Sequence, residues 1–173
     1  MSKRLLIVIA FVIVIIALAI AIPKISPGGQ ATTTPTEMRI EFIKEEMKRV
    51  SFGVTESIGA QKSEALTITE DGTEFYNVNV EGERGSQTKF QADAEELKRI
   101  RALIAETGFM QIPKEQFDAG DNVTEFTRYT LTATLGSNTK TIQWVDEESS
   151  KDSVPALLTR LKDSLLELTK DHQ

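Results

Sequence analysis

The chain has 173 residues, of which 26 are acidic and 20 are basic, and none is cysteine. The lack of cysteine excludes disulfides, thiolate catalysis, a thiolate-bound zinc ion and a lipoprotein anchor. The formal net charge of −6 should repel phosphate backbones, and no basic stripe with interleaved aromatic residues offsets it. We therefore expect no nucleic-acid partner.

An uninterrupted apolar run over residues 5–22 follows the basic residues Lys3 and Arg4. Its 18 residues would form a helix about 27 Å long, close to the roughly 30 Å hydrocarbon core of a bilayer. Only one basic residue, Lys24, stands just past the run, and the more positive flank stays in the cytoplasm. The sequence predicts residues 1–4 in the cytoplasm, a transmembrane signal anchor over 5–22, and the remainder outside the cell membrane.

Two other interpretations of residues 5–22 stay open. Small residues at positions 17, 19 and 21 fit a cleavage site of a signal peptide, although the run is longer than the about 7–15 residues usual there. A pilin-type leader, cut just before a helix that packs in a filament, would also begin with such a run. The fate of the segment is therefore left undecided, with the retained anchor as the expectation.

Residues 23–36, PKISPGGQATTTPT, are rich in proline, glycine and threonine and predict a linker. Residues 37–173 then have the size usual for one domain with its own core. Beyond the apolar run lie 18 basic residues and all 26 acidic ones, a formal charge of about −8. We expect an acidic extracytoplasmic domain over 37–173.

The first element of this domain has an ambiguous pattern. Residues 34–37, TPTE, carry the threonine cap, proline and glutamate typical of a helix start. Apolar residues then recur at helical spacing at Met38, Phe42, Ile43, Met47 and Val50. Alternation typical of a strand is also present over residues 40–42 and 50–54. We expect a helix or irregular segment to about Lys48, and a strand from there to about Thr55.

Two hairpins, each followed by a helix, are predicted for the rest of the domain. The first hairpin turns at Asp71-Gly72, between alternating runs over residues 66–69 and 75–80. A helix begins after the cap Asp93 and ends at Gly108. The second hairpin spans residues 129–145, and the last helix follows Ser153 as its cap. The apolar stripe of that helix consists of Leu157, Leu158, Leu161, Leu165 and Leu168.

This order of elements predicts an α+β fold. An antiparallel sheet of about four or five strands would be built from the two hairpin–helix units, with the helices on one face. One N-terminal transmembrane helix would precede it.

Five stretches carry a resemblance that spans about residues 48–170: RVSFGVTESIG, EALTITEDG, ETGFMQIPKEQF, RYTLTATL and TKTIQWVD. The pattern resembles uncharacterised archaeal and bacterial domains that are secreted or tethered by one N-terminal helix. The resemblance implies a location and a fold, and it implies no activity and no site residue.

The sequence contains no evident catalytic, metal-binding or cofactor-binding constellation. The only histidine, His172, is next to the last residue, where chains fray, which argues against a histidine triad or metal site. Asp118, Asp121 and Asn122 share one loop and have oxygen ligands that calcium accepts, but the spacing is not that of an EF-hand. We interpret them as a polar loop and predict no metal, no cofactor and no catalytic residue.

Three further features have a structural and a functional interpretation. An acidic cluster before the last helix is interpreted as favouring that helix's N-terminus rather than as a cation site, and it consists of Asp146, Glu147, Glu148 and Asp152. Trp144, the only tryptophan, is assigned to core packing rather than to ligand stacking. Residues 122–124 form a sequon that makes Asn122 a candidate N-glycosylation site outside the membrane.

We therefore expect a membrane-tethered binding or interaction module that contacts an envelope protein or a surface polymer. Two alternatives stay open. A cell-surface hydrolase working through carboxylates would need a deep pocket with two acids of opposed pKa shifts. A subunit of an envelope assembly would instead use its apolar helix for packing.

Overall fold

The computed structural model describes residues 38–53, 55–106 and 108–170. All of them belong to one compact unit, Thr36–Gln173. The predicted anchor over 5–22, the linker over 23–36, the helix start at 34–37 and His172 lie outside the described residues. None of the helices described is both long enough and apolar enough to span a bilayer.

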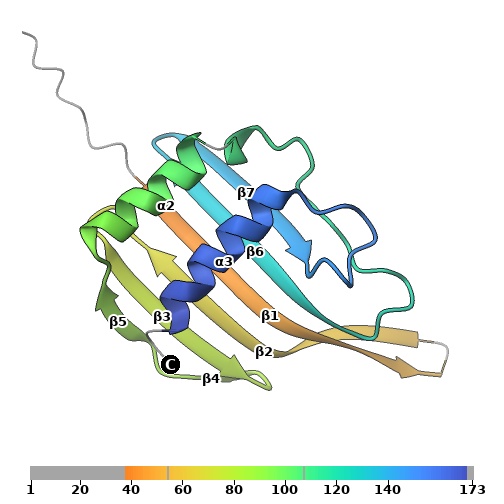
Figure 1. Cartoon of the computed structure of the whole chain (residues 1–173). Coiled ribbons are helices and arrows are strands. Elements are labelled where there is room, and N and C mark those ends of the chain that lie inside the picture. Colours follow the sequence, from red (N-terminus) through yellow and green to blue (C-terminus); the bar gives the residue numbers. More distant parts are fainter. Residues whose placement is uncertain (1–37, 54, 107, 171–173) are drawn as a thin grey trace, which may run out of the picture. The chain divides into compact units, whose positions relative to one another are not determined.

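The domain is built on one antiparallel sheet of seven described strands, in the order β4-β3-β2-β1-β6-β7, with β5 also paired to β3 (Figure 1). The strands are β1 (Met38–Phe52), β2 (Thr55–Ile68), β3 (Thr73–Val80), β4 (Glu83–Arg84), β5 (Thr88–Gln91), β6 (Glu125–Leu135) and β7 (Asn138–Val145). The prediction of four or five strands was therefore wrong. The two longest strands, β1 and β2, lie in the middle of the sheet.

Two helices cross one face of this sheet, α2 (Ala94–Glu106) and α3 (Ala156–Lys170) (Figure 1). The side chain of Asp93 accepts a hydrogen bond from the N–H of Glu95 at 3.0 Å, which confirms the predicted helix cap. A short 3-10 helix, η1 (Phe109–Gln111), follows α2 after Gly108. The cap predicted at Ser153 is wrong, because α3 begins at Ala156, directly after Pro155.

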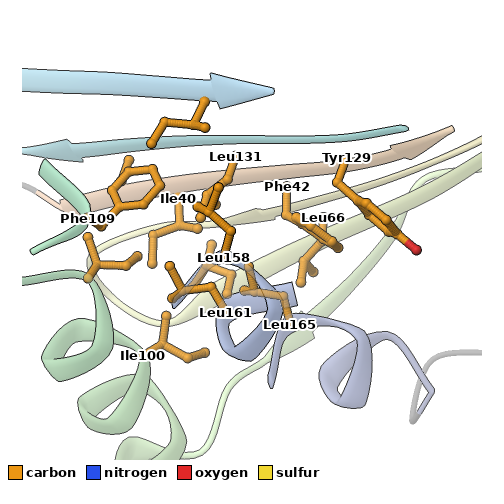
Figure 2. Packing of buried hydrophobic residues seen from close by; sticks show 14 of the residues in the cluster. Ile40, Phe42, Leu66, Ile100, Phe109, Tyr129, Leu131, Leu158, Leu161 and Leu165 are labelled. Atoms are coloured by element: carbon orange, nitrogen blue, oxygen red, sulfur yellow. The ribbon is translucent and has the colours of Figure 1, made fainter. Parts of the chain in front are cut away.

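The hydrophobic core lies between the helices and the sheet (Figure 2). Leu158, Leu161 and Leu165 of α3 are fully buried and point toward the apolar side chains of β1, β2 and β6. Each buried leucine contributes about 1.5–3 kcal/mol to folding before entropy costs. Trp144 is 1% exposed and stacks on Tyr129 with ring centroids 5.7 Å apart, which confirms that it belongs to the core.

The turn between β2 and β3 forms as predicted. Gly72 has a φ of 79°, a left-handed conformation that glycine adopts without steric cost. Asp71 Oδ1 accepts hydrogen bonds from the Thr69 hydroxyl at 2.6 Å and from the N–H of Thr73 at 3.0 Å. These hydrogen bonds, the one from Thr69 first, lower the pKa of Asp71 to about 2.

The expected helix or irregular segment before Lys48 is instead the first two-thirds of β1. Met38, Ile40 and Phe42 face the helices and are buried, while Met47 has the opposite parity and is buried on the other face. Met47 lies opposite Ala60 of β2 and Phe126 of β6. Because a single strand buries residues on both faces, its apolar positions mimic a helical spacing.

The two short strands at the sheet edge had no recognisable sequence pattern. Residues of β4 are exposed, and in β5 only Phe90 is partly buried. Both strands are held by backbone pairing to β3, with Asn79 opposite Arg84 and Phe75 opposite Lys89. Alternation of apolar side chains cannot reveal strands that bury so little.

Candidate functional site

The sheet face turned away from α2 and α3, here called the uncovered face, is polar over most of β6 and β7. Strand alternation puts one set of residues into the core and turns the other set to this face. Thr132 and Thr141 face each other across the two strands with their hydroxyls 2.9 Å apart. In these strands the uncovered face is made chiefly of Thr130, Thr132, Thr134, Thr139 and Thr141.

A hollow of about 490 Å³ lies at one end of the uncovered face, here called the arginine hollow. Side chains from β1, β2, β6 and β7 line it together with Gln116, Asp118 and Ala119 of the loop after η1. That loop is held at the edge of β7, because the N–H of Phe117 donates to the carbonyl of Gln143 at 2.9 Å. A volume of this size is in the range of small-ligand and side-chain binding pockets.

The floor of the arginine hollow is apolar and its walls carry two cations. Met47 and Val145 are 5% and 2% exposed, and both line the hollow beside Phe126. Arg128 donates from Nε to Glu45 Oε2 at 2.8 Å, and its Nη2 is also 2.8 Å from that oxygen. Glu45 thus neutralises Arg128 in a charge-assisted pair.

Arg49 is the less neutralised of the two arginines. Its Nη1 donates to the backbone carbonyl of Asp121, while the nearest carboxylate oxygen, on Glu56, is 3.9 Å away. Arg49 Nε is buried and makes no hydrogen bond with any residue that the structure describes. A guanidinium in this state can pair with a carboxylate brought by a ligand.

A second polar cluster lies on the helix-covered side of the sheet, around the buried carboxylate of Glu64. Lys62 Nζ and Lys44 Nζ lie 2.7 Å and 3.2 Å from Glu64 Oε1, and the Tyr76 hydroxyl donates to Oε2 at 2.9 Å. Glu64 is 4% exposed. Lys62, Lys44 and Tyr76 supply partners for both oxygens of this carboxylate, so we interpret the cluster as structural.

Opposing effects act on the pKa of Glu64. Burial would raise it, but the hydrogen bonds from Lys62 and Tyr76 and the charge of Lys44 outweigh burial and lower it. The hydrogen bond to Glu64 raises the pKa of Lys62 in turn. The pKa values of Glu64 and Asp71 are both lowered, whereas a catalytic acid–base pair needs pKa shifts in opposite directions.

The structure does not bring the loop residues Asp118, Asp121 and Asn122 together as ligands. Asp118 accepts a hydrogen bond from Gln116 at 2.7 Å, and the Asp121 carboxylate is 3.7 Å from Lys151 Nζ. The candidate glycosylation residue Asn122 is exposed in this loop. Within the described ranges, no three acidic or histidine side chains are arranged to hold a metal ion.

Three of the four acidic residues before α3, Asp146, Glu147 and Asp152, have separate partners. Asp146 accepts a hydrogen bond from the N–H of Thr127 at 2.7 Å, and Glu147 accepts one from the Thr159 hydroxyl. Asp152 pairs with Lys114 at 2.6 Å. These hydrogen bonds and this ion pair hold the loop before α3 against neighbouring elements.

Sequence reasoning missed Arg49, Arg128 and Glu64. For Glu64 a signal existed, because it shares strand parity with Leu66 and Ile68 and so had to face the core. No comparable signal marks Arg49 or Arg128, because the hollow forms only when β1, β6 and a distant loop come together.

No protein-family model and no curated protein matches the chain.

Proposed function

We propose that this chain is a single-pass membrane protein whose extracytoplasmic domain binds another molecule through its uncovered face. The apolar run over residues 5–22 and the charge bias around it support the anchor and its orientation. The observation that carries the binding role is the arginine hollow on the uncovered face. The partner is an envelope protein or a surface polymer.

The chemistry of the arginine hollow favours a partner that brings a carboxylate next to an apolar group. Arg49 supplies an incompletely paired guanidinium, and Met47 and Val145 supply the apolar floor. The chain as a whole is acidic, so this local cation also sets the orientation in which an acidic partner can approach.

Photo-cross-linking in intact cells tests the contact face. A photoreactive amino acid in place of Thr132, on the uncovered face of the full-length chain, should give one discrete adduct with the bound partner. The same amino acid at Asp163, which is exposed on α3, should give none. Equal adducts at both positions, or none at Thr132, would contradict the proposal.

A pair of arginine substitutions on one strand face tests the role of the hollow. Arg49 and Arg39 both lie on β1 and point to the uncovered face, but only Arg49 lines the arginine hollow. Arg49→Gln should reduce the Thr132 adduct, and Arg39→Gln should leave it unchanged. An equal reduction by both variants would show that overall charge causes the effect, and it would contradict a role of the arginine hollow in binding.

A further inference from the structure

Glu45 lies in the arginine hollow, on the same face of β1 as Met47 and Arg49. These three residues alternate along the strand, so each is about 7 Å from the next. Glu45 is directly opposite Arg128 in the pairing of β1 with β6, and this register brings the two side chains together. The side chains of Glu45 and Arg128 are only 21% and 29% exposed, so their ion pair is partly shielded from water.

The formal charges of the residues that line the arginine hollow cancel. Arg49 and Arg128 supply two positive charges, and Glu45 and Asp118 supply two negative ones. Arg128 is bound by Glu45 at 2.8 Å, whereas the nearest carboxylate oxygen to Arg49, on Glu56, is 3.9 Å away. An anion that enters the hollow can therefore pair with Arg49, but Glu45 and Asp118 repel it.

We propose that Glu45 determines the charge specificity of the arginine hollow: by neutralising Arg128, it makes the hollow accept a carboxylate with one negative charge and exclude groups with two, such as sulfate or phosphate. The proposal deepens the proposed function and rests on it, because both concern the same hollow. One guanidinium balances one carboxylate in a bidentate pair. A dianion in the same place would keep an uncompensated charge over the apolar floor of Met47 and Val145, which is costly away from water.

Backbone hydrogen bonds hold Arg49 and the loop that walls the hollow in fixed positions. The N–H of Arg49 donates to the carbonyl of Thr124 at 2.7 Å, and the N–H of Lys151 donates to the carbonyl of Asp118 at 2.9 Å. A site of this kind is organised before a ligand binds, and it changes shape only by breaking such bonds. We therefore expect no second cation to move into the hollow when a dianion approaches.

An NMR titration of the full-length chain in detergent micelles tests the specificity, with the Arg49 Nε–H signal as the probe of binding. One ligand is isovalerate, which carries one carboxylate beside an apolar group, and the other is inorganic sulfate, which carries two charges at neutral pH. At constant ionic strength the native chain should bind isovalerate at least about ten times more tightly than sulfate. A chain that binds sulfate as tightly as isovalerate, or that binds neither, would overturn the proposal.

Glu45→Gln isolates the contribution of the charge, because the amide keeps the shape of the side chain and leaves Arg128 uncompensated. Electrostatic energy is proportional to the charge of the ligand, so the gain in affinity for a dianion is about the square of the gain for a monoanion. We expect the dissociation constant to fall about three-fold for isovalerate and about ten-fold for sulfate. The control Glu41→Gln removes the partner of Arg39 on the same face of β1 but outside the hollow, and it should change neither constant.

Arg128→Gln should have the opposite effect. It leaves the charge of Glu45 without its partner, so both anions should bind more weakly, and sulfate should lose more affinity than isovalerate. A merely structural role of the pair would instead weaken binding in both variants. Equal factors for the two ligands, or no difference between Glu45→Gln and Glu41→Gln, would overturn the proposal.

These titrations need no partner molecule, so they fail separately from the proposed function. Discrimination between isovalerate and sulfate without an adduct at Thr132 would contradict only the proposed function. An adduct at Thr132 without this discrimination would contradict only the role of Glu45.

Discussion

Leu161→Asp should destabilise the domain by more than about 3 kcal/mol, because it puts an unpaired charge into the core. Leu161 is fully buried between α3 and the sheet (Figure 2). Domains of this kind have a total stability of about 5–15 kcal/mol, so the variant should lose a large share of it. Urea unfolding of residues 37–173 measures the loss, with fluorescence of the single, buried Trp144 as the probe.

Ala156→Asp is the matched control for this experiment. It makes the same change of charge on the same helix, but at its exposed first residue. An acid near a helix N-terminus is favourable by about 0.3–1 kcal/mol, so no loss is expected. If Leu161→Asp were as stable as Ala156→Asp, α3 would not be packed as described, and if residues 37–173 unfolded without cooperativity, they would not form one domain.

Glu64→Gln should cost about 2 kcal/mol at neutral pH, because it leaves Lys44 and Lys62 without their shared carboxylate. The amide keeps the shape of the side chain and can still accept a hydrogen bond from the Tyr76 hydroxyl. The loss of stability therefore reports mainly the contribution of the negative charge. The control Glu41→Gln removes one partner of the exposed Arg39–Glu41 pair and should cost no more than about 1 kcal/mol.

The pH dependence of this loss has a definite sign. The pKa of Glu64 is lowered in the folded chain, so its contribution is complete above the ordinary value of 4.5 and disappears as the pH falls through the folded pKa. The stability difference between the native chain and Glu64→Gln should therefore be constant near neutral pH and shrink in acid. A difference that grew in acid would show that the pKa of Glu64 is raised.

Local patterns in the sequence predicted the elements that bury one clear face. The β2–β3 hairpin, the β6–β7 hairpin and both helices follow from alternation, the Asp71-Gly72 turn and leucine spacing. The first part of β1 could not be predicted as a strand, because Met47 is buried on the face opposite to Phe42. β4 and β5 could not be predicted either, because backbone pairing to β3 holds them and they bury little apolar area.

The candidate site was less predictable than the fold. Arg49 and Arg128 are 79 positions apart in the numbering and meet only because β1 pairs with β6. The Asp121 carbonyl that accepts a hydrogen bond from Arg49 belongs to a loop whose sequence does not predict this contact. A hollow assembled by long-range pairing leaves no periodic signal along the chain, whereas a buried acid such as Glu64 does.

Cysteine labelling with a membrane-impermeant maleimide in intact cells tests the central claim, that an anchored domain presents its uncovered face to a partner outside the cytoplasm. The cysteine-free chain allows one thiol at a time, at Thr141 on the uncovered face or at Asp163 on α3. We predict that Asp163→Cys is labelled as fast as in the purified chain, and that Thr141→Cys is protected until detergent extraction. Equal rates at both positions would exclude a contact on this face, and no labelling of either before lysis would place the domain inside.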